Sequence, residues 1–205
     1  MTRKHKTDDR SKLERFLPWL LVIGGIIGLI ASFMIMFEKV TLLENPSYRL
    51  ACDVNPVVSC GSVMQSDQAE AFGFPNPFIG LVSFPVLITV GMAWLAGARF
   101  KRWFWLGLQA GVIFGVGLVH WLFYQSVYNI GALCLYCMVV WAIVIPIFWY
   151  VTLYNLRTDS IRLKGRLLSI EAFLQRHHLD ILVVWFLAIA GLILYNFWYY
   201  FGVVL

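Results

Sequence analysis

The sequence predicts an all-α integral membrane protein with five transmembrane helices, of which the first four form a bundle. Two observations predict this fold class. Of the 205 residues, 60% are hydrophobic, 17% are aromatic and only 13% are charged, which makes the chain far more apolar than an ordinary globular domain. The charged residues also gather in short segments between uncharged runs of about 20 residues or more, the length that a helix needs to cross a bilayer. The net charge of +5 therefore indicates membrane topology rather than a nucleic-acid partner.

The first predicted span follows a basic segment at the N-terminus. Residues 1–15 carry six Lys and Arg residues, and we expect a disordered or interfacial cytoplasmic tail there. Residues 16–37 contain no charge, and no signal-peptide cleavage site is evident, so they are predicted to remain as the first span. Residues 38–76 are the longest polar stretch between spans. Their Asn-Pro pairs and glycines predict a folded loop with at most short helices.

Four further spans are predicted beyond this loop. They cover residues 77–98, 103–124, 132–154 and 181–201. A tight basic turn separates the first two of these, and an uncharged break at residues 125–131 separates the next two. Residues 155–180 are basic again, and Leu163 belongs to an apolar pattern with helical spacing, so we expect a cytoplasmic amphipathic helix on the membrane. The chain thus divides into the tail, a four-span core at 16–154, this segment and a last helix at 181–205.

The basic residues predict how the chain crosses the membrane. Of the 16 Lys and Arg residues, 14 lie in the tail, after the second span or after the fourth span, which are all on one side. By the positive-inside rule this side is cytoplasmic, so the C-terminus and the loop at 38–76 lie on the outer face. Two close pairs of cysteines then also face the outer, oxidising compartment. They are Cys52 and Cys60 in the loop, and Cys134 and Cys137 at the outer end of the fourth span.

The second cysteine pair forms a Cys-x-x-Cys motif that is expected to open the helix beginning near Ala132. At this spacing the Cβ atoms of Cys134 and Cys137 lie roughly 5–6 Å apart on one helix face, so a disulfide can form or break with little backbone movement. The N–H groups and the dipole of the first turn favour a thiolate. A mobile loop pair, Cys52 and Cys60, can exchange disulfides with a soluble protein and reduce the fixed pair. A lipid-soluble quinone is then the natural two-electron acceptor, and the aromatic spans offer it an apolar cavity.

A non-catalytic membrane module is the alternative. The four cysteines could bind a structural zinc ion through four thiolates, form fixed disulfides, or be buried and inert. Four cysteines allow three complete pairings, which all stay open at this point. An oxidising compartment and the absence of a nearby histidine weigh against zinc, so no metal is expected. His120, in the middle of a span, is a proton carrier or, more simply, a neutral imidazole bonded to a neighbouring helix.

The spacing of these residues resembles that of the vitamin K epoxide reductase family over nearly the whole chain. The matching pattern consists of Cys52-Asp53-Val54, Ser59-Cys60, Ser66, Asn76 and the late Cys-x-x-Cys motif. The resemblance implies a thiol–disulfide oxidoreductase and quinone reductase with a four-helix bundle around the quinone. It implies that Cys52 exchanges with the redox partner, that Cys60 attacks Cys134, and that Cys137 reduces the quinone.

The resemblance also implies residues that bind the quinone. Ser66 and Asn76 match family positions near the quinone and the loop. Four residues after the motif, where vertebrate members have a tyrosine, this chain has Trp141, which can stack and donate one N–H but lacks a hydroxyl. This departure favours a plain quinone, ubiquinone or menaquinone, over vitamin K epoxide.

The partner and the location follow from the same resemblance. Many bacterial members carry a fused thioredoxin-like domain after the fifth span, whereas this chain ends at Leu205. We therefore expect a separate DsbA-like thioredoxin-fold protein on the outer face as partner. The expected function is to reoxidise that secreted protein in the bacterial inner membrane and so to support disulfide bond formation.

Overall fold

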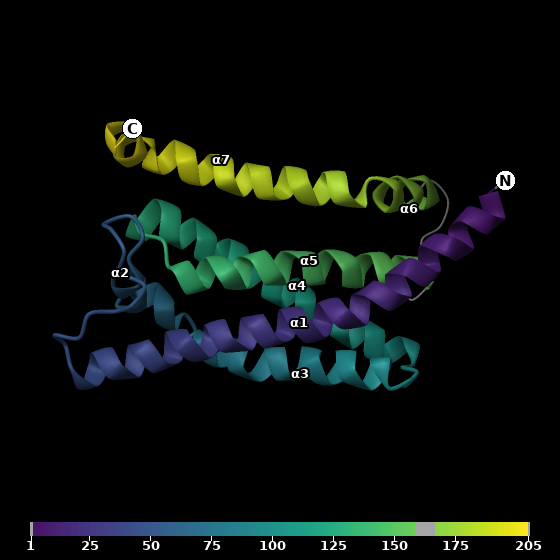
Figure 1. Cartoon of the computed structure of the whole chain (residues 1–205), viewed down its shortest axis with the longest axis horizontal. Coiled ribbons are helices and arrows are strands. Elements are labelled where there is room, and N and C mark those ends of the chain that lie inside the picture. The colour runs from purple at the N-terminus through teal and green to yellow at the C-terminus, as the bar shows by residue number, and fades with distance from the viewer. Residues whose placement is uncertain (1, 159–166, 205) are drawn as a thin grey trace.

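The computed structural model describes residues 2–158 and 167–204, which fold almost entirely into helices (Figure 1). In chain order these are α1 (Thr2–Glu44), α2 (Cys60–Met64), η1 (Asp67–Glu70), α3 (Pro77–Leu95), α4 (Arg102–Tyr124), η2 (Gln125–Ile130), α5 (Leu135–Arg157), α6 (Leu167–Arg176) and α7 (His178–Val204). η1 is a short 3-10 helix, and η2 is a π-helical continuation of α4. The only strand-like pairing among these residues is one parallel bridge between Val58 and Leu133.

Five helices in the described part of the chain are long and apolar enough to cross a membrane. They are Leu13–Glu44, Pro77–Leu95, Arg102–Ile130, Leu135–Arg157 and His178–Trp198. The predicted fold class is therefore confirmed. α1 packs against α3 and α5, and α4 packs against α5, so these four helices form a bundle. α7 lies along the bundle on the side away from α1, while α2 and the N-terminus lie at opposite ends (Figure 1).

Small residues allow α1 and α3 to approach each other closely. A Cβ atom built on Gly91 of α3 would lie 2.8 Å from the carbonyl oxygen of Pro18 in α1. One built on Gly80 would lie 2.1 Å from the Oγ of Ser32. Helices in a bilayer gain little from burying apolar surface against each other, so close van der Waals contact along such a seam supplies much of their association.

Hydrogen bonds from two tryptophans attach α7 to the bundle. The indole N–H of Trp149 in α5 donates to the carbonyl oxygen of His178 (3.0 Å), and that of Trp185 in α7 donates to Nε2 of His120 in α4 (2.9 Å). Nδ1 of His120 lies 2.7 Å from the carbonyl oxygen of Val116. A neutral ring with Nδ1 protonated satisfies both contacts. The structure thus gives His120 a structural role as a link between two helices.

Helix α1 is longer at both ends than the sequence predicts. Residues 2–15 are helical, so the tail is not disordered, while its interfacial position stays a prediction. At the other end the helix continues past residue 37 and stops at Glu44, since the next turn-forming residues are Asn45 and Pro46. The loop after α1 therefore begins seven residues later than predicted, and Glu38 and Lys39 belong to the helix.

The region between α4 and α5 also differs from the prediction. Residues 125–130 were expected to break the helix, but they remain helical, and the chain turns at Gly131, whose φ is 70°. α5 begins at Leu135 rather than near Ala132, with Cys134 in an extended conformation at the N-cap. The amphipathic helix expected within 155–180 is present as α6, whereas Leu163 lies outside the described residues.

The close seam between α1 and α3 gives a prediction about stability. Gly91→Ala should lower the apparent melting temperature in detergent, because the added methyl group meets the fixed backbone at Pro18, and overpacking costs about 1–3 kcal/mol. Gly117→Ala in α4 is the control, since a Cβ atom there would meet nothing within 4 Å. Circular dichroism during heating measures both variants. Equal melting temperatures would contradict this account of the seam.

Candidate functional site

A short backbone pairing docks the loop between α1 and α2 onto the start of α5. The N–H of Leu133 donates to the carbonyl oxygen of Val57 (2.7 Å), and the N–H of Ser59 donates to that of Leu133 (3.0 Å). Val58 and Leu133 thereby form the parallel bridge. The two paired segments run in the same direction, so Cys60 and Cys134, which follow them, enter one buried cluster. The predicted meeting of the two cysteine pairs is a consequence of this pairing.

The loop cysteines form a disulfide in the structure. Cys52 and Cys60 are bonded, with their Cα atoms 5.7 Å apart. The side chain of Asp53 holds the turn between them by accepting a hydrogen bond from the N–H of Gly61 (3.0 Å). The side chain of Asn55 accepts hydrogen bonds from the N–H groups of Val57 and Val58. Both cysteines are almost completely buried, at 1% and 0% exposure. In this conformation the disulfide faces the inside of the protein and not a soluble partner.

The second pair is in the dithiol state. Cys134 and Cys137 are free, with Cys134 buried at the N-cap of α5 and Cys137 partly buried one turn further. A hydrogen bond from the Cys137 thiol, helped by the N–H groups of Cys137 and Tyr136, lowers the pKa of Cys134 below its ordinary value, although burial opposes this shift. Cys134 is therefore the sulfur in this pair that most readily becomes a nucleophilic thiolate.

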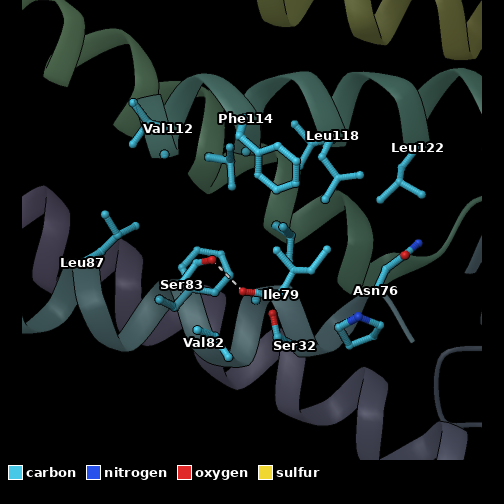
Figure 2. Close-up of a pocket in the computed structure, with 18 of the residues that line it drawn as sticks. Ser32, Asn76, Ile79, Val82, Ser83, Leu87, Val112, Phe114, Leu118 and Leu122 are labelled. Carbon is cyan, nitrogen blue, oxygen red and sulfur yellow. Dashed lines mark hydrogen bonds between the residues drawn. The ribbon is translucent and has the colours of Figure 1, made fainter. Parts of the chain in front are cut away.

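A cavity of about 550 Å³ lies between α3 and α4 and reaches the cysteine motif. Figure 2 shows side chains of α4, such as Leu118 and Leu122, above those of α3, such as Ile79 and Val82. Val82 is 69% exposed, so the cavity opens on the outside of the bundle between these two helices. The polar or ionisable side chains along its wall are Ser32, Lys39, Asn76, Ser83, Cys134 and Cys137. An apolar cavity with a few polar groups suits a flat apolar ligand with a small number of polar atoms.

The structure brings two of the three non-cysteine candidates to this cavity. Asn76 lies at its end nearest the loop, where the side chain donates to the carbonyl oxygen of Gln68 (2.7 Å) and accepts from the N–H of Ala71 (3.2 Å). Trp141 lines the wall and packs edge-on against Phe123, with ring centroids 5.2 Å apart.

Ser66, the third candidate, lies outside the large cavity. Its hydroxyl donates to the carbonyl oxygen of Val63 (2.7 Å). It lines a small neighbouring pocket together with Cys137 and Trp141. Ser66 is thus near the cysteine motif, but its hydroxyl proton is donated to Val63 and not toward the cavity.

The sequence analysis missed two charged residues of this region, Glu38 and Lys39. Lys39 lines the cavity, and its ammonium group forms an ion pair with Glu70 of η1 (2.7 Å), which ties the loop to α1. Glu38 is 2% exposed, and its Oε2 lies 3.6 Å from the Sγ of Cys52. The usable signal was the absence of a helix breaker before Asn45, which predicts that the helix continues through both charges.

The described residues contain no group of three or more His, Cys, Asp or Glu side chains placed to hold a metal ion. The four thiolates of the zinc alternative are not present together, because Cys52 and Cys60 are bonded to each other.

Comparison with known families gives one match. The model of the vitamin K epoxide reductase family matches residues 19–152, about two thirds of the chain, including both cysteine pairs. No curated protein matches the chain.

The state of Cys134 gives a prediction about pH. Because its pKa lies below that of an ordinary thiol, its alkylation by iodoacetamide should increase with pH around a midpoint below the usual value of about 8.5. Cys137→Ala removes the main hydrogen-bond donor and should raise this midpoint, whereas Cys137→Ser keeps a donor and should raise it less. Mass spectrometry of the peptide that contains Cys134 measures the rates. The same midpoint in all three proteins would contradict the assigned cause.

Proposed function

The chain belongs to the vitamin K epoxide reductase family, and we propose that it reoxidises a secreted thioredoxin-fold protein and passes the electrons to a membrane quinone. Enzymes of this family are membrane thiol oxidoreductases that work with quinones. The observation that carries the proposal is the docking of the loop disulfide onto the second cysteine pair, beside an apolar cavity. Together these features form a route from the loop to a site inside the membrane.

In the first step, a dithiol of the partner reduces the Cys52–Cys60 disulfide, with Cys52 as the residue that exchanges. The partner that fits this chemistry is a separate DsbA-like protein on the outer face. Because both sulfurs are buried, the loop must move away from α5 for this exchange. Few backbone hydrogen bonds hold residues 57–59 to residue 133, so the movement breaks little regular structure.

In the second step, Cys60 attacks Cys134 of the oxidised motif and forms a mixed disulfide, which Cys52 then resolves. The parallel pairing of the loop with residue 133 supports this route, because it brings Cys60 and Cys134 into one cluster. The bonding of the cysteines in the structure agrees with this route too. A bonded loop pair beside a reduced motif is the state after internal transfer and before electrons leave the protein.

In the third step, Cys134 and Cys137 close into a disulfide and give up two electrons and two protons. A bound quinone supplies the chemistry of a two-electron, two-proton acceptor. Cys137 is the thiol we assign to this contact, because it lines both the large cavity and its small neighbour.

The polar groups of the cavity fit the two oxygens of a quinone. The Asn76 amide has two N–H donors and uses one for Gln68, so the other is left for a ligand. Lys39 adds a positive charge at the same wall. Ser66 donates its proton to Val63, and we therefore assign it to supporting the loop. Trp141 offers a ring and one N–H in place of a hydroxyl, which supports ubiquinone or menaquinone as acceptor over vitamin K epoxide.

We propose that the N-terminus is cytoplasmic and that the loop and the C-terminus face outward from a bacterial inner membrane. The N-terminus and α6 lie at one end of the bundle, and α2 and the C-terminus lie at the other (Figure 1). Of the 13 Lys and Arg residues in the described part of the chain, 11 belong to segments at the first end, as the positive-inside rule requires. In this arrangement residues 16–154 are the catalytic core, and 155–180 and 181–205 are accessory.

The electron route predicts the behaviour of the cysteine variants. Each of Cys52→Ala, Cys60→Ala, Cys134→Ala and Cys137→Ala should abolish quinone reduction by a reduced thioredoxin-fold oxidase, followed through quinone absorbance. Cys52→Ala should also accumulate a Cys60–Cys134 disulfide, since the resolving thiol is missing.

The controls separate this route from the structural alternative. Non-reducing mass spectrometry identifies the mixed disulfide, and elemental analysis measures zinc in the purified protein. Full turnover in Cys137→Ala would exclude the route. Stoichiometric zinc in a wild-type protein that reduces no quinone would favour the structural alternative.

The cavity predicts an effect on quinone affinity. Gly111 of α4 lines the cavity with nothing within 4 Å of its Cβ position, so Gly111→Leu should fill part of the space. The KM for quinone should rise about tenfold, which corresponds to roughly 1.4 kcal/mol of lost contact. Gly117→Leu, on the same helix but outside the cavity, is the matched control and should leave the KM unchanged. An unchanged KM in Gly111→Leu would mean that the quinone binds elsewhere.

A further inference from the structure

A buried carboxyl group lies beside the sulfur that resolves the mixed disulfide. Glu38 is 2% exposed near the outer end of α1, and its Oε2 lies 3.6 Å from the Sγ of Cys52. In the disulfide this sulfur carries no proton, so the contact stabilises neither group as a hydrogen bond. Once the disulfide is reduced, the same position puts the carboxylate within reach of the Cys52 thiol proton.

The surroundings of Glu38 connect both cysteine pairs. Cys134 and Tyr136 of the Cys-x-x-Cys motif belong to the same buried cluster as Cys52, and the charge of Glu38 opposes the lowering of the Cys134 pKa. Tyr48 of the loop packs in the same cluster as the cysteines. One carboxyl group is therefore coupled to the sulfur that loses a proton and to the sulfur that gains one.

A simple structural role does not account for this carboxyl group. The neighbouring cation, Lys39, forms its ion pair with Glu70. Glu38 is therefore not needed to neutralise Lys39. Burying a carboxylate costs free energy unless an opposite charge or several hydrogen bonds compensate for the lost water. An ionisable side chain in such a place within a membrane protein is most often part of the chemistry.

We propose that Glu38 is a catalytic residue that carries the proton between the two cysteine pairs when the mixed disulfide is resolved. This inference rests on the electron route proposed above. The Cys52 thiol gives its proton to Glu38 as its sulfur attacks Cys60. The Cys52–Cys60 bond forms and the Cys60–Cys134 bond breaks, so Cys52 is oxidised and Cys134 is reduced. Glu38 then returns the proton to the Cys134 thiolate, and the step consumes no other reactant.

The test compares Glu38→Gln with Glu44→Gln, an exposed glutamate at the end of the same helix. Resolution is followed by rapid acid quench and non-reducing mass spectrometry of the Cys60–Cys134 disulfide, together with quinone absorbance, from pH 6 to pH 10. At neutral pH, Glu38→Gln should resolve about 10²-fold more slowly and accumulate the mixed disulfide. Its rate should recover at high pH, where hydroxide ionises Cys52, whose ordinary pKa is about 8.5.

Glu44→Gln should keep the rate and pH profile of the wild type, and Glu38→Asp should restore part of the rate at neutral pH. An unchanged profile in Glu38→Gln would overturn the proposal. So would a slow rate in both Glu38 variants that does not recover at high pH, because that result indicates a purely structural role. A wild-type protein that never reduces quinone would instead contradict the electron route.

Discussion

The parallel pairing of residues 57–59 with residue 133 is the interaction on which the site depends. It consists of a few backbone hydrogen bonds, yet it joins a loop and a helix start that are more than 70 residues apart in the chain. Cys60 and Cys134 each come directly after the paired residues, so their positions follow from the backbone rather than from side-chain packing. Such an attachment holds the loop pair against the motif with few hydrogen bonds, so the proposed exchange with a partner breaks little regular structure.

The charges near the loop serve two different purposes. Lys39 and Glu70 join α1 to η1 on the wall of the cavity, where an ion pair with one partly exposed member avoids the full cost of burial. Glu38, one residue earlier on the same helix, points to the cysteine cluster instead. Two adjacent helical residues lie about 100° apart around the helix axis. One turn of α1 therefore contacts both the redox cluster and the cavity.

Sequence reasoning predicted the fold class and the cysteine pairs because these leave local signals. Uncharged runs mark spans, and the spacings of Cys52, Cys60, Cys134 and Cys137 are visible without a structure. The predicted end of α1 was wrong because the first charged residue was taken as the end of the span. Glu38 and Lys39 are instead buried under the loop that follows α1. The extended N-cap conformation of Cys134 likewise depends on the pairing of the preceding residue, Leu133, with the loop. That pairing joins segments far apart in the chain, and no periodicity in the sequence reports it, whereas the end of α1 could have been read from Asn45 and Pro46.

The opening of the cavity between α3 and α4 has a consequence for how the protein meets its acceptor. α3 and α4 both cross the membrane, and exposed apolar side chains such as Val82 line the opening, so a ligand enters from the hydrocarbon region and not from water. For the proposed quinone acceptor, the concentration that sets the binding rate is then its mole fraction in the lipid, and encounters occur by diffusion in two dimensions. Under the proposed function, the oxidation of a secreted protein is thereby coupled to the composition of the bilayer, including every other enzyme that draws on the same quinone pool.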